Sequence, residues 1–138
     1  MRKNEGRVYF AFDGDDFNPH QITKLLKIQP TNIRLKNSLP SGKLPKFSSW
    51  IFSSDNIIDE IIDIYDMTAV LVKTLESKVD IINEIKQKFN VTTRLEIVLS
   101  FSTDEEVSTP IIGFETDTIA FLAKVGASVD IDTYLQAS

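Results

Sequence analysis

The chain has 138 residues, of which 42% are hydrophobic and 25% charged, with five glycines and five prolines. This usage is typical of a folded globular domain and excludes a disordered or collagen-like chain. The net charge of −5 disfavours a general nucleic-acid binder, and the complete lack of cysteine excludes both a disulfide framework and a cysteine nucleophile. We expect a single α+β domain over residues 1–138.

The sequence predicts neither export nor membrane insertion. The apolar stretch behind the charged start runs only from Val8 to Phe12 and leads directly into acidic residues, so no signal peptide is expected. The longest apolar runs, such as residues 69–72, fall far short of the roughly 20 residues that cross a bilayer. We therefore expect a cytoplasmic protein.

A strand and a helix are predicted at the beginning of the chain. Residues 7–13 alternate between two faces, which is the period-two pattern of a strand. Asn18 and Pro19 are typical of a helix N-cap followed by a proline in the first helical position. The apolar spacing continues in helical register until Pro30, which we expect to end the helix.

The next segment predicts two strands joined by a loop. Residues 31–37 and 48–53 both alternate, and the second of these carries Trp50 on its apolar side. The loop between them, residues 38–47, contains two prolines and a glycine and is too short for an interdomain linker. It is predicted to be a hairpin connection or a mobile flap.

Two helices are predicted within residues 55–88, because apolar residues recur there at helical spacing. The break is expected near Ser77, with Asp80 at the start of the second helix. Residues 92–101 alternate most clearly and predict a strand, and residues 110–114 predict another.

A last helix is predicted from Asp117 to Gly126, where glycine is the usual residue just past a helix end. The unit that begins at Asp13 and the unit that begins at Glu115 share a weak similarity of apolar spacing. We predict an α+β fold with a mixed or antiparallel sheet of about five or six strands, with helices mainly on one face and a ferredoxin-like arrangement.

Several of these segments resemble a known bacterial family, the domain of unknown function 4279. The resemblance covers nearly the entire chain in the same order. It rests on Asp13-Gly14-Asp15-Asp16-Phe17-Asn18-Pro19, Ile22-x-x-Leu25-Leu26-x-Ile28-x-Pro30-Thr31, the isolated Trp50 and Val129-Asp130-Ile131-Asp132-x-Tyr134. It implies a bacterial intracellular α+β domain and carries no catalytic residue. This chain departs from the common pattern at Asn18, where many members have aspartate.

The acidic turn formed by Asp13, Asp15 and Asp16 is the most suggestive chemical feature. Its structural interpretation is a turn whose carboxylates interact with backbone amides and the positive start of a helix. A calcium-binding helix-loop-helix hand is excluded, because its sixth and twelfth positions would be occupied by Asn18 and Lys24. We predict no metal and no cofactor.

An alternative combines this turn with a second acidic pair near the C-terminus. Asp130 and Asp132 lie two residues apart, so both carboxylates face the same side of an extended segment. If they approached Asp13 and Asp15, the four side chains could hold a divalent cation. The chain would then be a metal-dependent hydrolase or phosphotransfer enzyme.

No other catalytic device is predicted. His20 is the single histidine and occupies the first turn of a predicted helix, where a solvent-exposed residue is the expected interpretation. There is no Gly-x-Ser-x-Gly elbow, and the five glycines match neither a phosphate-binding loop nor a dinucleotide fingerprint.

The distribution of charge indicates a binding surface. Residues 17–54 contain no acidic residue but six basic ones, whereas the rest of the chain is strongly acidic. A protein partner, or the acidic part of a second copy, would complement this stretch, and nucleic acid is disfavoured. We predict a non-enzymatic protein-interaction module, such as a regulator or an immunity-like protein. The predicted binding residues are Arg34, Lys36, Lys43, Lys46 and Trp50.

Overall fold

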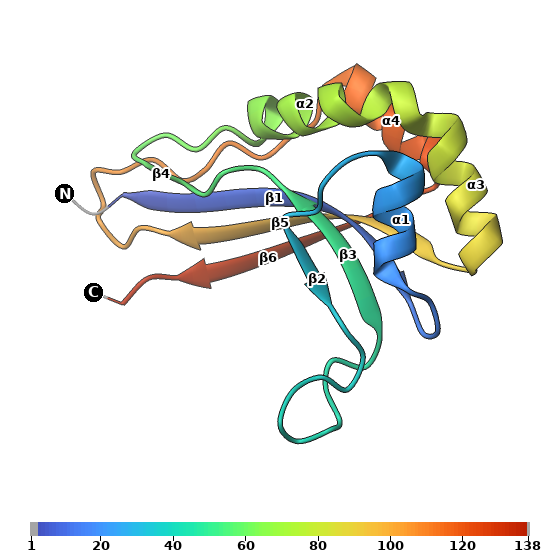
Figure 1. Cartoon of the computed structure of the whole chain (residues 1–138). Helices are drawn as coiled ribbons and strands as arrows, with labels where there is room; N and C mark the ends of the chain where they lie inside the picture. The colour runs from blue at the N-terminus through green and yellow to red at the C-terminus, as the bar shows by residue number, and fades with distance from the viewer. Residues whose placement is uncertain (1–2, 138) are drawn as a thin grey trace.

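A six-stranded mixed sheet organises the part of the chain that the computed structural model describes, residues 3–137 (Figure 1). Its strand order is β2-β3-β1-β5-β6, and β4 pairs with the other end of β1. β5 and β6 are parallel, and the remaining pairs are antiparallel. The strands are β1 (Asn4–Gly14), β2 (Asn32–Arg34), β3 (Ser48–Ser53), β4 (Ile57–Asp59), β5 (Thr92–Phe101) and β6 (Ser128–Leu135).

The helices all lie on one face of this sheet, and the opposite face is left open (Figure 1). The predicted α+β class, with five or six strands and helices mainly on one face, is therefore confirmed. A 3-10 turn separates α2 from α3 at the predicted break near Ser77. The helical elements are α1 (Pro19–Leu26), α2 (Ile64–Leu75), η1 (Glu76–Lys78), α3 (Val79–Phe89) and α4 (Thr116–Val125).

The core lies between the sheet and the helices, because strand alternation sends one set of side chains to the helical side. Phe12 is fully buried, and its ring meets Trp50 and Phe10 edge-on at 5.6 and 5.5 Å between centroids. Each buried large apolar side chain contributes about 1.5–3 kcal/mol. The other strand residues buried on this side include Val8, Phe10, Leu95, Ile97 and Leu99.

Helix α1 begins as predicted and ends earlier than predicted. Asn18 accepts a hydrogen bond from the backbone N–H of His20 at 3.1 Å, and Pro19 occupies the first helical position. The helix ends at Leu26, because Lys27 adopts a left-handed conformation with φ of 60°. Pro30 lies beyond the helix rather than at its end.

The predicted strand over residues 110–114 is wrong. Ile111 makes one isolated bridge with Asp63, and its N–H and carbonyl bond to the backbones of Ile62 and Ile64. Pro110 lacks the N–H that would extend the ladder, and Gly113 has no side chain to pack on a sheet. The sequence pattern also missed β4, which covers only three residues.

The ferredoxin-like arrangement is not confirmed. In that arrangement another strand separates the two strands of a β-α-β unit. Here β5 and β6 are adjacent parallel strands joined by α4. Within residues 3–137, none of the helices has the length and apolar character that a bilayer crossing requires.

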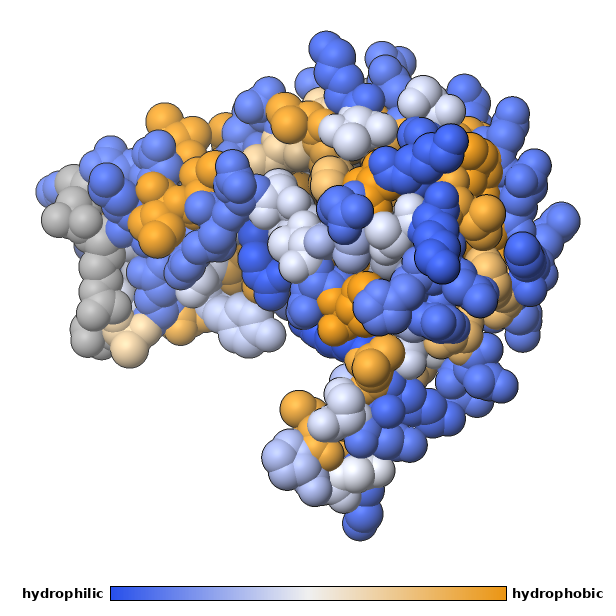
Figure 2. Space-filling model, viewed as in Figure 1, coloured by the Kyte–Doolittle hydropathy of each residue, from blue (hydrophilic) through white to orange (hydrophobic). Residues whose placement is uncertain are grey.

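The connection between β2 and β3, residues 35–47, projects away from the body, and we call it the arm (Figures 1 and 2). Because β2 and β3 are antiparallel neighbours, the arm is the predicted hairpin connection. Backbone hydrogen bonds from Asn37 to Pro45 and from Leu39 to Leu44 cross it at 2.9 Å.

Candidate functional site

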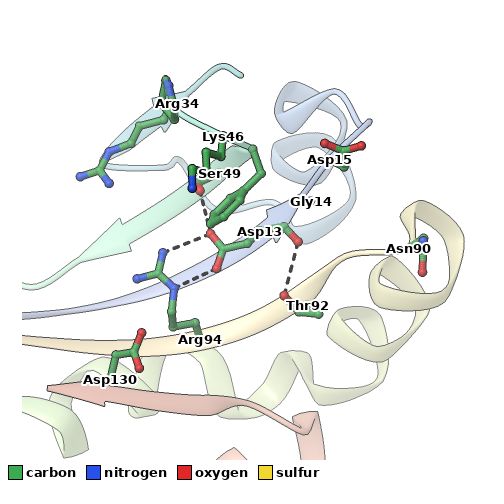
Figure 3. A pocket seen from close by; sticks show the side chains of 12 residues that line it. Asp13, Gly14, Asp15, Arg34, Lys46, Ser49, Asn90, Thr92, Arg94 and Asp130 are labelled. Carbon is green, nitrogen blue, oxygen red and sulfur yellow. Dashed lines mark hydrogen bonds and ion pairs between the residues drawn. The ribbon is translucent and has the colours of Figure 1, made fainter. Parts of the chain in front are cut away.

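A pocket of about 610 Å³ opens on the uncovered side of the sheet (Figure 3). It lies where the end of β1, the start of β5 and the base of the arm come together. Its mixed polar and apolar lining contains both signs of charge. The lining residues are Asp13, Gly14, Asp15, Arg34, Pro45, Lys46, Phe47, Ser49, Asn90, Thr92, Arg94 and Asp130.

A partly buried ion pair between Asp13 and Arg94 forms the floor of the pocket. Arg94 donates hydrogen bonds from Nε to Asp13 Oδ2 at 2.8 Å and from Nη2 to Oδ1 at 3.1 Å. Ser49 Oγ also donates to Asp13 Oδ1, at 2.7 Å. The side chains of Arg94 and Asp13 are only 16% and 11% exposed, so this two-point contact is shielded from solvent.

Arg94 also organises the aromatic side chain beside the pocket. Its Nη1 donates to the hydroxyl of Tyr9 at 3.1 Å. The guanidinium carbons of Arg94 and Arg7 each lie 5.4 Å from the centre of the Tyr9 ring, within the range of a cation-π contact. Hydrogen bonding to Asp13 is the main cause that raises the pKa of Arg94, so this side chain stays charged.

Glu96 lies next to this ion pair and is almost completely buried, with 4% of its side chain exposed. Its Oε1 accepts a hydrogen bond from Arg94 Nη1, whereas its buried Oε2 accepts no hydrogen bond from a donor among the described residues. The pKa of Glu96 is raised from 4.5 to about 7, mainly because the side chain is buried; hydrogen bonding with Asp132 also raises it, and Arg94 opposes both effects. Two ionised carboxylates cannot donate to each other, so a protonated Glu96 is the form that can bond Asp132.

These contacts engage the charged groups at the floor of the pocket with one another. Asp13 and Arg94 neutralise each other, and Glu96 does not line the pocket. His20, the single histidine, is exposed on α1 and does not line the pocket either. Ser49 Oγ contacts the carboxylate of Asp13, but that carboxylate is already held by Arg94, so the pocket presents charged and apolar groups suited to binding.

The family model for a domain of unknown function, DUF4279, matches residues 4–136. The chain belongs to this family. The comparison with curated proteins and the comparison with solved structures each gave no match. Membership agrees with the resemblance noted in the sequence and assigns no activity to the pocket.

The predicted basic residues do not share one environment in this family member. Arg34 and Lys46 line the pocket. Lys36 Nζ pairs with Asp15 Oδ1 at 2.5 Å, and Lys43 is exposed on the arm.

Trp50 requires a correction, because its side chain is fully buried in the core. Its indole N–H donates to Thr23 Oγ1 at 3.0 Å, and its ring contacts Phe12. The alternation of β3 directs Trp50 toward the helices and Ser49 toward the open face. Trp50 therefore cannot serve as a stacking platform on the surface.

The four aspartates of the metal-enzyme alternative do not form one site. Asp13 is bound by Arg94, and Asp15 is bound by Lys36. Asp130 lines the same pocket as Asp13 and Asp15, whereas Asp132 does not line it and lies near Glu96. Among residues 3–137, no group of three acidic or histidine side chains is arranged to hold a metal ion.

Sequence reasoning did not single out Arg94, Glu96 or Tyr9 as site residues. The alternation of residues 92–101 did place Arg94 and Glu96 on the polar side of their strand. The missing information was the register, which sets Arg94 opposite Ala11 and within reach of Asp13. Only that pairing makes these polar residues neighbours.

Proposed function

We propose that this chain is a protein-interaction module that binds its partner through the arm and the adjoining side of the pocket. The observation that carries this proposal is the exposed apolar character of a segment that projects from the body (Figure 2). The large apolar side chains of the arm lie close together in sequence, and each of them is between 45% and 52% exposed. These residues are Leu35, Leu39, Leu44 and Phe47.

Unpaired positive charge accompanies these apolar residues. Arg34, Lys43 and Lys46 make no ion pair with any other residue of the described range, 3–137. An apolar centre with arginine and an aromatic residue at its edge is typical of protein interfaces, and large exposed apolar patches are uncommon on isolated chains. The complementary partner carries apolar groups within an acidic surface.

The same features support binding over catalysis. The charged groups at the floor of the pocket are engaged with one another, so they fix the shape of the open face. The cations at its rim are free to contact another molecule. We propose that the interaction takes place in the bacterial cytoplasm, in keeping with the lack of cysteine. The proposed role of the protein is that of a regulator or an immunity-like protein.

Affinity capture from the native host tests the proposal. Immobilised wild type should retain one or a few proteins, and the variant Lys43→Glu/Lys46→Glu should lose them, because both substitutions reverse charge without touching the core. Leu39→Ser/Leu44→Ser should lose the same proteins through the apolar contact.

The matched control is Lys73→Glu/Lys124→Glu, which reverses two exposed lysines on helices α2 and α4. This variant should retain every partner. Circular dichroism checks that all variants are folded. Recovery of identical proteins by the wild type and by both arm variants would contradict the proposed surface.

A further inference from the structure

Strands β2 and β6 form the two edges of the main sheet, so each has a neighbour on one side only. All eight residues of β6 are exposed. On the other edge, Asn32, Arg34 and Leu35 are exposed and Ile33 is partly so. An exposed edge with unpaired N–H and carbonyl groups is a template for pairing with another strand.

The two edges carry complementary sequences. Residues 32–35 read Asn-Ile-Arg-Leu, and residues 129–132 read Val-Asp-Ile-Asp. Each edge thus alternates apolar residues with polar ones, and the charges have opposite sign. Neither Arg34 nor Asp130 makes an ion pair with another residue in the described part of the chain.

The register places the matching residues on the same faces of the sheet. Arg34 lies opposite Ser49, and Asp130 lies beside Glu96, so both charges are on the open face. Ile33 lies opposite Trp50 and Ile131 beside Ile97, so both apolar residues are on the helical face. In a sheet that continues across two molecules, the two apolar residues would therefore meet on the helical face, and the two opposite charges would meet on the open face.

We propose that β2 of one copy pairs antiparallel with β6 of a second copy and continues the sheet from molecule to molecule. The ladder sets Ile33 opposite Ile131 and Arg34 opposite Asp130. Leu35 then lies opposite Val129, and the ladder covers Leu35, Val129 and Ile131, whose side chains are 40–48% exposed in the single chain. This inference rests on the proposed function, since it names a second copy as one partner of the interaction module.

The strand directions set the geometry of this assembly. β2 runs opposite to β3, β3 and β5 both run opposite to β1, and β6 runs parallel to β5. β2 therefore runs opposite to β6, and a second copy in the same orientation presents an antiparallel edge. Such a contact uses two different surfaces, so it leaves one edge free at each end and builds a series of oligomers rather than a closed dimer.

Charge argues against a symmetric pairing of two β6 strands. A two-fold pair centred on Ile131 would set Asp130 of one copy opposite Asp132 of the other. Like charges directly opposite each other destabilise a strand pair. The basic edge of β2 removes this repulsion and adds an attractive pair.

Sedimentation velocity at low salt tests the proposal with variants that reverse the charge of Arg34 or of Asp130. Wild type should associate with increasing concentration, and Arg34→Glu or Asp130→Lys alone should weaken association about tenfold. An equimolar mixture of the two variants should restore association, because each then presents an edge that complements the other. A wild type that remains monomeric, or a mixture that associates no better than its components, would overturn the proposal.

Cysteine crosslinking tests the register independently, because the chain has no cysteine of its own. A mixture of Leu35→Cys and Val129→Cys chains should give a mixed disulfide dimer under mild oxidation. Val70→Cys, on the exposed side of α2, is the control partner and should give little mixed dimer with Leu35→Cys. Equal yields from both mixtures would refute the register.

Failure here is distinguishable from failure of the proposed function. Lys43→Glu/Lys46→Glu leaves Arg34 and Asp130 unchanged, so it should still self-associate while losing captured proteins. Normal capture by a wild type that does not self-associate would remove only this inference. Self-association with no captured protein from the host would remove the arm as a binding surface and leave the edge pairing in place.

Discussion

Arg94 on β5 donates two parallel hydrogen bonds to Asp13 at the end of β1, although the two residues are 81 positions apart in the chain. Ser49 on β3 donates to the same carboxylate, so one side chain ties together three strands of the sheet. This contact fixes the floor of the pocket and the base from which the arm projects.

Removing one partner of this pair should destabilise the fold. We expect Asp13→Ala to lower the free energy of unfolding by about 3 kcal/mol, because it leaves the shielded guanidinium of Arg94 without its main partner. Urea denaturation followed by circular dichroism measures the change. Asp13→Asn keeps an acceptor for Ser49 and should cost less than Asp13→Ala. A loss below about 0.5 kcal/mol for Asp13→Ala would mean that the pair is not a structural element.

The stability of the protein should depend on pH through Glu96. Its pKa is raised from 4.5 to about 7, so the folded chain binds an additional proton between these values. Stability from this group is therefore fully present below pH 4.5 and is lost as the pH rises through about 7. The slope from one group is at most about 1.4 kcal/mol per pH unit.

Glu96→Gln tests this dependence because glutamine resembles the protonated acid. Between about pH 5 and about pH 8 the variant should lose less stability than wild type. The measurement is the melting temperature of each protein at both pH values. Asp132→Asn should also flatten the dependence, since it removes the like charge that contributes to the raised pKa. Parallel pH profiles for wild type and Glu96→Gln would rule out Glu96 as the titrating group.

Trp50 should report on the core and not on partner binding. The chain has one tryptophan, and its side chain is fully buried against Phe12. We expect blue-shifted emission that acrylamide quenches weakly until the chain is unfolded. Trp50→Phe should cost about 1–2 kcal/mol through loss of the hydrogen bond to Thr23 and of packing. Strong quenching of the folded protein would contradict this burial.

Gly113 should tolerate no side chain. A Cβ atom at this position would overlap the ring of Tyr65, so Gly113→Ala requires that ring to move. We expect a loss of about 1–3 kcal/mol in the free energy of unfolding. Gly42→Ala is the comparison variant, because a Cβ atom at Gly42 would meet no other atom. Any loss of stability in this variant should come only from the φ of 70° at that position. A neutral Gly113→Ala would mean that residues 110–114 do not pack against α2.

Local patterns accounted for the elements that carry strong periodicity. The alternation of residues 7–13, 48–53 and 92–101 predicted three strands that form the centre of the sheet. Asn18 and Pro19 predicted where α1 begins, because a cap and a first-turn proline act within a few residues. Such signals depend on neighbours in the chain and need no knowledge of the fold.

The chain by itself therefore determined the α+β class, the main strands with their two faces, and the uneven distribution of charge. Tertiary structure decided which charges became neighbours, because the pairing of β1 with β5 brings Asp13 to Arg94 from opposite parts of the chain. It also decided that Trp50 is buried while β6 stays exposed. Alternation fixes the two faces of a strand, but burial depends on which elements cover each face, and the helices here cover only one.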